Sequence, residues 1–186
     1  QGGPHDHTTA GIAVALLEAM DPKFKEYGRK IVRNARALAQ ELMDNGLKLV
    51  TNGTDNHMIL IDLTPFGKGQ GVFVQDALDE AGITLNKNTI PNDPSSPFYP
   101  SGVRLGTPAL TTRGMKENEM KVIGKLISQI VYKVANYKLS DDKEERSAYL
   151  KKFREEIKNN ETIKSVRNQV LELCEKFPLY SNLKTI

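Results

Sequence analysis

Apolar residues recur at spacings of three and four along two long stretches of the chain, the pattern that one face of a helix produces. The first stretch covers residues 22–45 and carries Phe24, Tyr27, Ile31, Val32, Ala35, Leu38, Leu42 and Met43. The second covers residues 115–137 and carries Val122, Ile123, Leu126, Ile127, Ile130, Val131 and Val134. We predict a helix over each, and a further helix over residues 4–20.

The ends of the first long helix carry residues that favour helix termini. Asp21 is suited to cap its N-terminus, and Pro22 to occupy the first helical position, where a missing N–H has no cost. Gly46 is suited to end the helix, because glycine adopts the left-handed conformation of a C-terminal cap.

Short apolar runs predict strands at residues 47–51 and 58–63, joined by a polar turn at 52–57. A helix is expected from Val72 to a stop at Gly82. Strand-like segments at 83–85 and 103–105 flank a long loop. Two more helices close the chain; Ser140 is expected to cap the first, and the second carries Ile163, Val166, Val170 and Phe177. This order predicts an α/β fold of two layers, a small, mainly antiparallel sheet covered by helices.

Composition restricts the function classes. The 186 residues suffice for one well-packed domain. The net charge of +3 comes from 26 basic and 23 acidic residues that are interspersed, which argues against a nucleic-acid-binding surface. No apolar run is long enough to cross a bilayer, so we expect no membrane association. The lone Cys174 excludes an internal disulfide and suits a reducing cytoplasm; its apolar neighbours at helical spacing predict packing in the core.

The loop before Arg104 is the strongest candidate for a functional segment. Prolines at 91, 94, 97 and 100 stiffen it, and long loops in compact domains are usually functional. Arg104 lies in the short strand between two glycines. Its guanidinium can bind a carboxylate or a phosphate with two parallel hydrogen bonds, so we interpret Arg104 as an anion clamp. The alternative is a surface arginine in an ordinary salt bridge.

Two further candidates lie at the N-terminus. Gly2 and Gly3 precede a helix, where free backbone N–H groups can bind an anion; a plain turn is the alternative. His5 and His7 flank Asp6, but no second set of ligands follows at a useful spacing, so we expect no metal site.

Residues 55–57 and Lys87 also invite a catalytic interpretation. Asp55, Asn56 and His57 lie between two strands, where such side chains usually bond to local backbone, so we expect a structural role that positions the 88–108 loop. Lys87 has no apolar surroundings to lower its pKa, so we reject it as a Schiff-base amine.

Five motifs, in order, resemble those of the serine hydroxymethyltransferase family. They are QGGP at 1–4 with His7 following, GTDNH at 53–57, TLNKN at 84–88, PND at 91–93 and SGVRLGTPALTTRG at 101–114. Together they span residues 1–114 and are far more specific than any single short motif. The helical remainder is compatible with the family in length and pattern.

The resemblance implies a fold-type I enzyme that uses pyridoxal phosphate and interconverts serine and glycine with tetrahydrofolate. It implies that Arg104 binds the substrate carboxylate and that Gly3 approaches the cofactor phosphate from the neighbouring subunit of a homodimer, with a tetramer as a further option. It also implies that Asn88 contacts the folate pterin and that Ser96, Pro97 and Phe98 lie beside the folate.

The chain departs from the family in one respect. The family's Schiff-base lysine lies in a Thr-Thr-His-Lys run upstream of QGGP, and this chain opens at Gln1 within that motif. We therefore expect a C-terminal portion of a cytoplasmic enzyme, with residues 1–45 ending the large domain and linker helices and 46–186 forming the small domain. The alternative is a non-catalytic isolated domain, either a folate- or anion-binding unit or an oligomerisation unit.

Overall fold

The computed structural model describes residues 2–179, so Gln1 of the first motif lies outside the described residues. The helices are α1 (Asp6–Met20), α2 (Pro22–Asp44), α3 (Gly71–Glu80), α4 (Pro108–Thr112), α5 (Glu117–Val134), α6 (Lys143–Lys158) and α7 (Glu161–Lys176). The strands are β1 (Lys48–Leu49), β2 (Met58–Asp62), β3 (Asn86–Asn88) and β4 (Gly102–Gly106), with short 3₁₀ turns at Val50–Asn52 and Thr64–Phe66.

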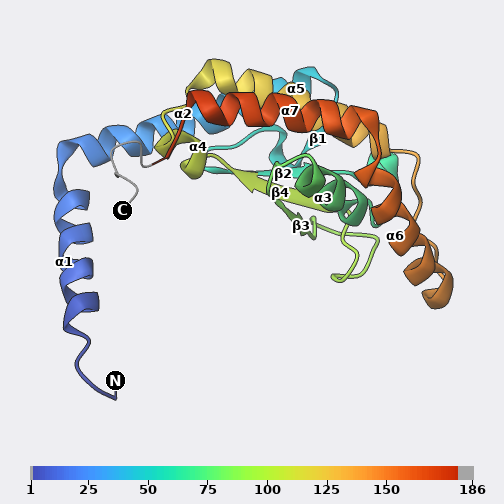
Figure 1. Cartoon of the computed structure of the whole chain (residues 1–186), viewed down its shortest axis with the longest axis horizontal. Coiled ribbons are helices and arrows are strands. Elements are labelled where there is room, and N and C mark those ends of the chain that lie inside the picture. Colours follow the sequence, from blue (N-terminus) through green and yellow to red (C-terminus); the bar gives the residue numbers. More distant parts are fainter. Residues whose placement is uncertain (1, 180–186) are drawn as a thin grey trace.

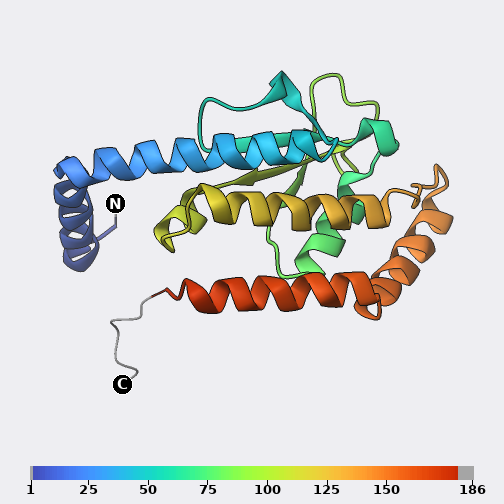
Figure 2. The ribbon, with the colours of Figure 1, turned by 90° about the horizontal axis from the view of Figure 1, so that it is seen from above.

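The strands form one antiparallel sheet in the order β1-β2-β4-β3. Helices α2, α5 and α7 run side by side over one face of this sheet (Figures 1 and 2). The core lies between the layers and includes Leu38, Leu42, Ile59, Ile61, Phe73, Leu78, Val103, Ile127, Ile130 and Ile163. The predicted two-layer α/β architecture with an antiparallel sheet is confirmed.

The ends of α2 follow the predicted capping chemistry. The Asp21 side chain accepts a hydrogen bond from the Lys23 N–H at 2.7 Å, and Pro22 begins the helix. Gly46 has φ +82°, and the Leu47 N–H beyond it donates to the Leu42 carbonyl at 3.0 Å. The left-handed glycine therefore satisfies carbonyls at the helix end, as a C-terminal cap requires.

The sequence prediction is wrong at several boundaries. Residues 83–85 are not a strand; the strand is Asn86–Asn88, because Leu85 packs against the core while the polar residues after it pair with β4. The strand predicted at 47–51 shortens to Lys48–Leu49. Asp142, not Ser140, caps α6 by accepting from the Glu145 N–H at 2.8 Å.

Helix α1 projects from the rest of the molecule (Figure 1). None of its residues is buried, and its exposed apolar side chains include Ile12, Val14, Leu16, Leu17 and Met20. The division of the chain at residue 45 stays a prediction. Within residues 2–179, no helix has the length and apolar character needed to cross a membrane.

Candidate functional site on the open face of the sheet

The face of the sheet that turns away from the core carries the candidate site. Side chains alternate between the two faces of a strand, so Ile59, Ile61 and Val103 enter the core. Residues directly opposite one another share a face. The strand register therefore places on the other face, here called the open face, Lys48, Met58, Leu60, Asp62, Asn86, Asn88, Gly102, Arg104 and Gly106.

Arg104 lies at the centre of the open face. It is opposite Leu60 on one side and Asn86 on the other, and its side chain is exposed. A shallow surface pocket beside it is lined by His57, Met58, Thr84, Leu85, Asn86, Leu105 and Gly106. Arg104 therefore projects from a paired strand into an open recess.

Arg104 differs from the other arginines in having no partner among residues 2–179. Each of the others bonds to a carboxylate or a backbone carbonyl; these are Arg29, Arg33, Arg36, Arg113, Arg146, Arg154 and Arg167. The salt bridge weighed as the alternative for Arg104 is absent from this part of the chain. Its guanidinium is free to bind an external anion.

Asn88 shares the open face with Arg104, one row of residues away. It is opposite Gly102, two positions before Arg104, and such diagonal neighbours lie roughly 7–8 Å apart. Its side-chain amide donates to the Thr89 carbonyl at 2.7 Å. The structure thus brings together two of the residues that the resemblance singled out.

Residues 96–98 lie apart from the recess at Arg104. Ser96, Pro97 and Phe98 are exposed, and the Phe98 side chain is 80% exposed. Phe98 lines a different recess, shared with Lys87 and Tyr99 and with residues of α3 and α6. They form the outer part of the loop that leads from Asn88 back to β4.

Gly3 is not brought near Arg104. It precedes α1, at the end of the molecule away from the sheet (Figures 1 and 2). A Cβ atom added at Gly3 would meet nothing within 4 Å, so no side chain or backbone of the described residues packs against Gly3 at that position.

The carboxylates near the open face are held by neighbouring donors. Asp62 accepts from Lys48 Nζ at 2.7 Å and from the Thr64 hydroxyl at 2.6 Å. Burial raises the pKa of Asp62, but these hydrogen bonds outweigh it, so its pKa lies below the ordinary value. Because Asp62 is paired with Lys48, the positive charge of Arg104 is left uncompensated on this face.

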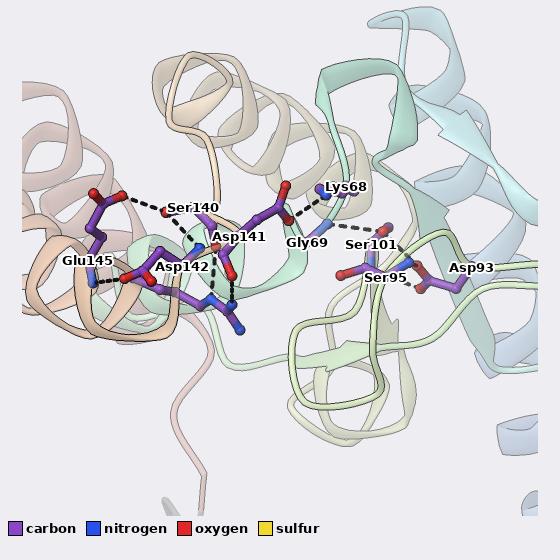
Figure 3. A network of polar contacts seen from close by, with 10 residues as sticks. Lys68, Gly69, Asp93, Ser95, Ser101, Ser140, Asp141, Asp142 and Glu145 are labelled. Carbon is purple, nitrogen blue, oxygen red and sulfur yellow. Dashed lines mark hydrogen bonds and ion pairs between the residues drawn. The ribbon is translucent and has the colours of Figure 1, made fainter.

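Asp93 is a structural residue of the loop whose role the sequence analysis missed. Its carboxylate accepts four hydrogen bonds, one from Ile90, one from Ser95 and two from Ser101; Figure 3 draws Asp93 with Ser95 and Ser101. The available signal was an aspartate two residues before a serine in a proline-rich loop, a common arrangement for side-chain-to-backbone bonding.

The turn at residues 52–57 has the expected structural role. Asn56 Oδ1 accepts from the Met58 N–H at 2.7 Å, and the Thr54 hydroxyl donates to the Met58 carbonyl at 2.6 Å. The His57 carbonyl accepts from the Thr107 N–H at 3.2 Å, which ties this turn to the end of β4. Asn56 and the His57 carbonyl therefore bond to backbone, and Asp55 pairs with Arg36 at 3.2 Å, so the structure shows no hydrogen bonds that link the three side chains as a catalytic triad within residues 2–179.

The remaining candidates have ordinary surroundings. Lys87 lies on the opposite side of β3 from Asn86, with its Nζ 6.0 Å from the centre of the Tyr99 ring. Cys174 is half-buried, not in the core as predicted, because it lies near the end of α7 at the wall of an apolar pocket. Among residues 2–179, no three His, Cys, Asp or Glu side chains cluster to bind a metal.

The structure is thus of the α/β class, with an antiparallel sheet that is covered on one side and presents on the other a guanidinium without a partner among residues 2–179. Comparison with known proteins identifies the family. A model of the family described as serine hydroxymethyltransferase matches residues 1–127. The chain belongs to the serine hydroxymethyltransferase family.

Curated relatives agree with this assignment. The chain is 59% identical over 135 residues to a serine hydroxymethyltransferase of Acidothermus cellulolyticus, covering 73% of this chain and 31% of the relative. It is 44% identical over 182 residues to that of Myxococcus xanthus, covering 98% and 38%. It is 44% identical over 180 residues to that of Alkalilimnicola ehrlichii, covering 97% and 37%. The chain thus spans about a third of the length of these relatives.

Proposed function

We propose that the longer protein to which this chain corresponds, here called the parent protein, is a serine hydroxymethyltransferase. It would interconvert serine and glycine and transfer the one-carbon unit to tetrahydrofolate. The observation that carries this proposal, beside family membership, is the Arg104 guanidinium on the open face, which has no partner among residues 2–179. Pyridoxal phosphate, when bound, would supply an electron sink for cleavage of the bond at the substrate Cα.

In this proposal Arg104 binds the α-carboxylate of serine. Two parallel N–H donors hold both carboxylate oxygens, which fixes the amino acid in orientation as well as in position. Arg104 can do this because it extends from a strand that pairs on both sides. Asp62 does not compete for the guanidinium, since Lys48 and Thr64 already bond to it.

The residues present fit the substrate better than they fit the cofactor. The guanidinium of Arg104 and the amides of Asn86 and Asn88 are donors suited to carboxylate and folate oxygens. Of the groups expected to touch the cofactor, this chain offers the Gly3 backbone, which lies away from the open face (Figure 1). We therefore propose that this chain forms one side of a shared site.

The rest of that site would come from elsewhere in the parent protein. The remaining length of the relatives would supply a fold-type I large domain with the cofactor's lysine, and Gly3 would serve the neighbouring subunit of a homodimer or tetramer. Asn88 and residues 96–98 would hold tetrahydrofolate beside the amino acid. A cytoplasmic location is part of the same proposal.

Arg104→Lys in the parent protein tests the assignment. An ammonium cannot reproduce the two parallel bonds, and losing a hydrogen bond to a charged group costs about 1.5–3 kcal/mol. We therefore expect kcat/KM for serine to fall on the order of 10- to 100-fold, since about 1.4 kcal/mol is a factor of ten. Steady-state kinetics of glycine formation measures it.

Arg36→Lys is the matched control. Arg36 is also an exposed arginine, but it pairs with Asp55 at 3.2 Å, and Asp55 is 98% exposed. Such surface pairs contribute little, so this variant should behave as the unchanged protein does. Normal serine turnover by Arg104→Lys, or equal losses in both variants, would contradict the assignment.

A further inference from the structure

The loop at residues 89–101 has a single carboxylate that reaches its beginning, middle and end. Asp93 Oδ2 accepts from the Ile90 N–H at 3.3 Å and from the Ser101 N–H at 2.9 Å. Asp93 Oδ1 accepts from the Ser95 N–H at 2.9 Å and from the Ser101 hydroxyl at 2.6 Å. Asp93 thereby closes the loop upon itself, as Figure 3 shows for Ser95 and Ser101.

Ser101 connects this closed loop to the core. It is fully buried, and its hydroxyl oxygen accepts from the Gly69 N–H at 3.0 Å. Its carbonyl accepts from the Leu63 N–H at 2.9 Å, next to the end of β2. The preceding carbonyl, of Pro100, accepts from the Gly71 N–H at the start of α3. The base of the loop is therefore fixed. Because Asp93 bonds both to Ser101 at this base and to Ser95, it also fixes where residues 95–99 lie.

The four bonds of Asp93 require a carboxylate. Every donor points at one of its two oxygens, and no lysine or arginine in the described part of the chain forms an ion pair with it. Burial raises the pKa of Asp93, but the hydrogen bonds from Ser101, Ser95 and Ile90 outweigh it and hold the pKa below its ordinary value. An asparagine would replace one acceptor oxygen by an NH₂ group that faces donors, so it would break one side of this arrangement.

The residues further out are those expected beside the folate. The Ser96 carbonyl accepts from the Tyr99 N–H at 2.9 Å, so residues 96–99 form a tight turn. This turn holds Phe98 outward with 80% of its side chain exposed. The turn begins three residues after Asp93, and the bonds of Asp93 to Ser95 and Ser101, on either side of the turn, fix its position.

We propose that Asp93 is a positioning residue for the second substrate: it holds residues 96–98 where tetrahydrofolate binds, without touching the ligand itself. The inference rests on the proposed function, because that function supplies the identity of the ligand. It predicts that loss of the carboxylate weakens folate binding and leaves the binding of serine at Arg104 unchanged. A pre-organised loop binds more tightly because less conformational freedom is lost upon binding.

Asp93→Asn in the parent protein tests this, with Asp141→Asn as the matched control. Asp141 belongs to the same network of contacts in Figure 3, but it pairs with Lys68 at 2.6 Å and has no hydrogen bond to residues 89–101 among the described residues. For Asp93→Asn we expect KM and the calorimetric Kd for tetrahydrofolate to rise on the order of tenfold, with KM for serine within about twofold. Amide hydrogen exchange within residues 89–101 should accelerate. Asp141→Asn should change none of these.

Ser101→Ala is a second variant in case Asp93→Asn does not fold. It removes the hydroxyl bond to Asp93 and also the acceptor for the Gly69 N–H, and it should give a change of the same kind in hydrogen exchange and in Kd for tetrahydrofolate. Unchanged folate affinity in Asp93→Asn, or equal losses for serine and folate, would overturn the proposal. Folate affinity and loop exchange do not depend on turnover. A parent protein that binds tetrahydrofolate but makes no glycine would therefore contradict the proposed function alone.

Discussion

At the scale of single residues, the pKa values of the carboxylates depend on whether hydrogen-bond donors surround them. Asp62 and Asp93 each receive several hydrogen bonds, and their pKa values are lowered although burial acts in the opposite direction. Asp79 has the contrary surroundings: burial raises its pKa, and the nearby charge of Asp76 adds to the effect. The two kinds of carboxylate should thus make opposite contributions to stability.

Asp62→Asn and Asp79→Asn are expected to shift stability in opposite directions at neutral pH. A lowered pKa means stability that is present above the unfolded-state value of about 3.9 and is lost as the pH falls through the folded-state value. A raised pKa means stability that is present below about 3.9 and is lost as the pH rises through the folded-state value. At pH 7, Asp62→Asn should lower the free energy of unfolding by about 1.5–3 kcal/mol, and Asp79→Asn should raise it.

Urea unfolding of the chain at neutral and acid pH measures both effects. The difference between Asp62→Asn and the unchanged chain should shrink as the pH falls from about 3.9 to the lower folded-state pKa of Asp62, because Asp62 becomes protonated first in the unfolded and then in the folded chain. A loss of stability in Asp79→Asn equal to that in Asp62→Asn would show that both carboxylates contribute in the same way.

At the scale of elements, the start of α3 is packed directly against the base of the loop. A Cβ added to Gly71 would lie 2.4 Å from the Gly102 carbonyl oxygen and 2.6 Å from that of Pro100. Backbone atoms of a paired strand cannot move aside cheaply. This close approach fixes how α3, β4 and the loop meet.

Gly71→Ala should therefore lower the free energy of unfolding by about 1–3 kcal/mol, the range for an overpacked core. Gly28→Ala is the matched control, since Gly28 lies within α2 and an added Cβ there meets nothing within 4 Å. It should raise stability by about 0.5–1 kcal/mol through helix propensity. Urea titration of both variants checks this, and a neutral Gly71→Ala would refute the close approach.

Elements with an apolar pattern of their own, including strands β2 and β4, were predictable, and strand β3, which has none, was not. Helix α2 follows from its apolar spacing and from Asp21 and Gly46, which act within a few residues of the helix ends. Strand β3 was misplaced by three residues because Asn86–Asn88 carries no apolar pattern; its backbone pairs with β4 across the loop. Likewise Asp142 and Ser140 are both good capping residues, and the local backbone path selects Asp142.

At the scale of the whole molecule, the residue expected at the cofactor phosphate, Gly3, and the residue expected at the substrate carboxylate, Arg104, are far apart in this chain. The N-terminal segment before α1, which includes Gly3, lies at one end of the molecule, away from strand β4, which carries Arg104 (Figure 1). The apolar side chains of α1 are exposed. The lysine on the open face, Lys48, is bonded to Asp62 at 2.7 Å. Among residues 2–179, the open face therefore offers no unpaired lysine placed to react with an aldehyde near Arg104.

We accordingly expect no specific labelling when the 186-residue chain is treated with pyridoxal phosphate and then borohydride. The parent protein, under the same treatment, should be labelled at one lysine with a stoichiometry near one, since a buried amine of lowered pKa reacts selectively. Intact mass and peptide mapping measure both. A stoichiometric label at one lysine of the chain itself would mean that this portion binds the cofactor unaided.

The amino-acid sequence by itself determined the long helices, the caps of α2, the antiparallel α/β class and the family, because each depends on residues close together in the chain or on motifs in order. Tertiary structure alone decided that Arg104 has no partner among residues 2–179, that Asn88 shares its face, and that Asp93 joins three parts of one loop. These facts depend on which distant residues come into contact. Whether a guanidinium is paired depends on which distant residues the fold brings within hydrogen-bond distance of it, and the sequence near the arginine does not show this.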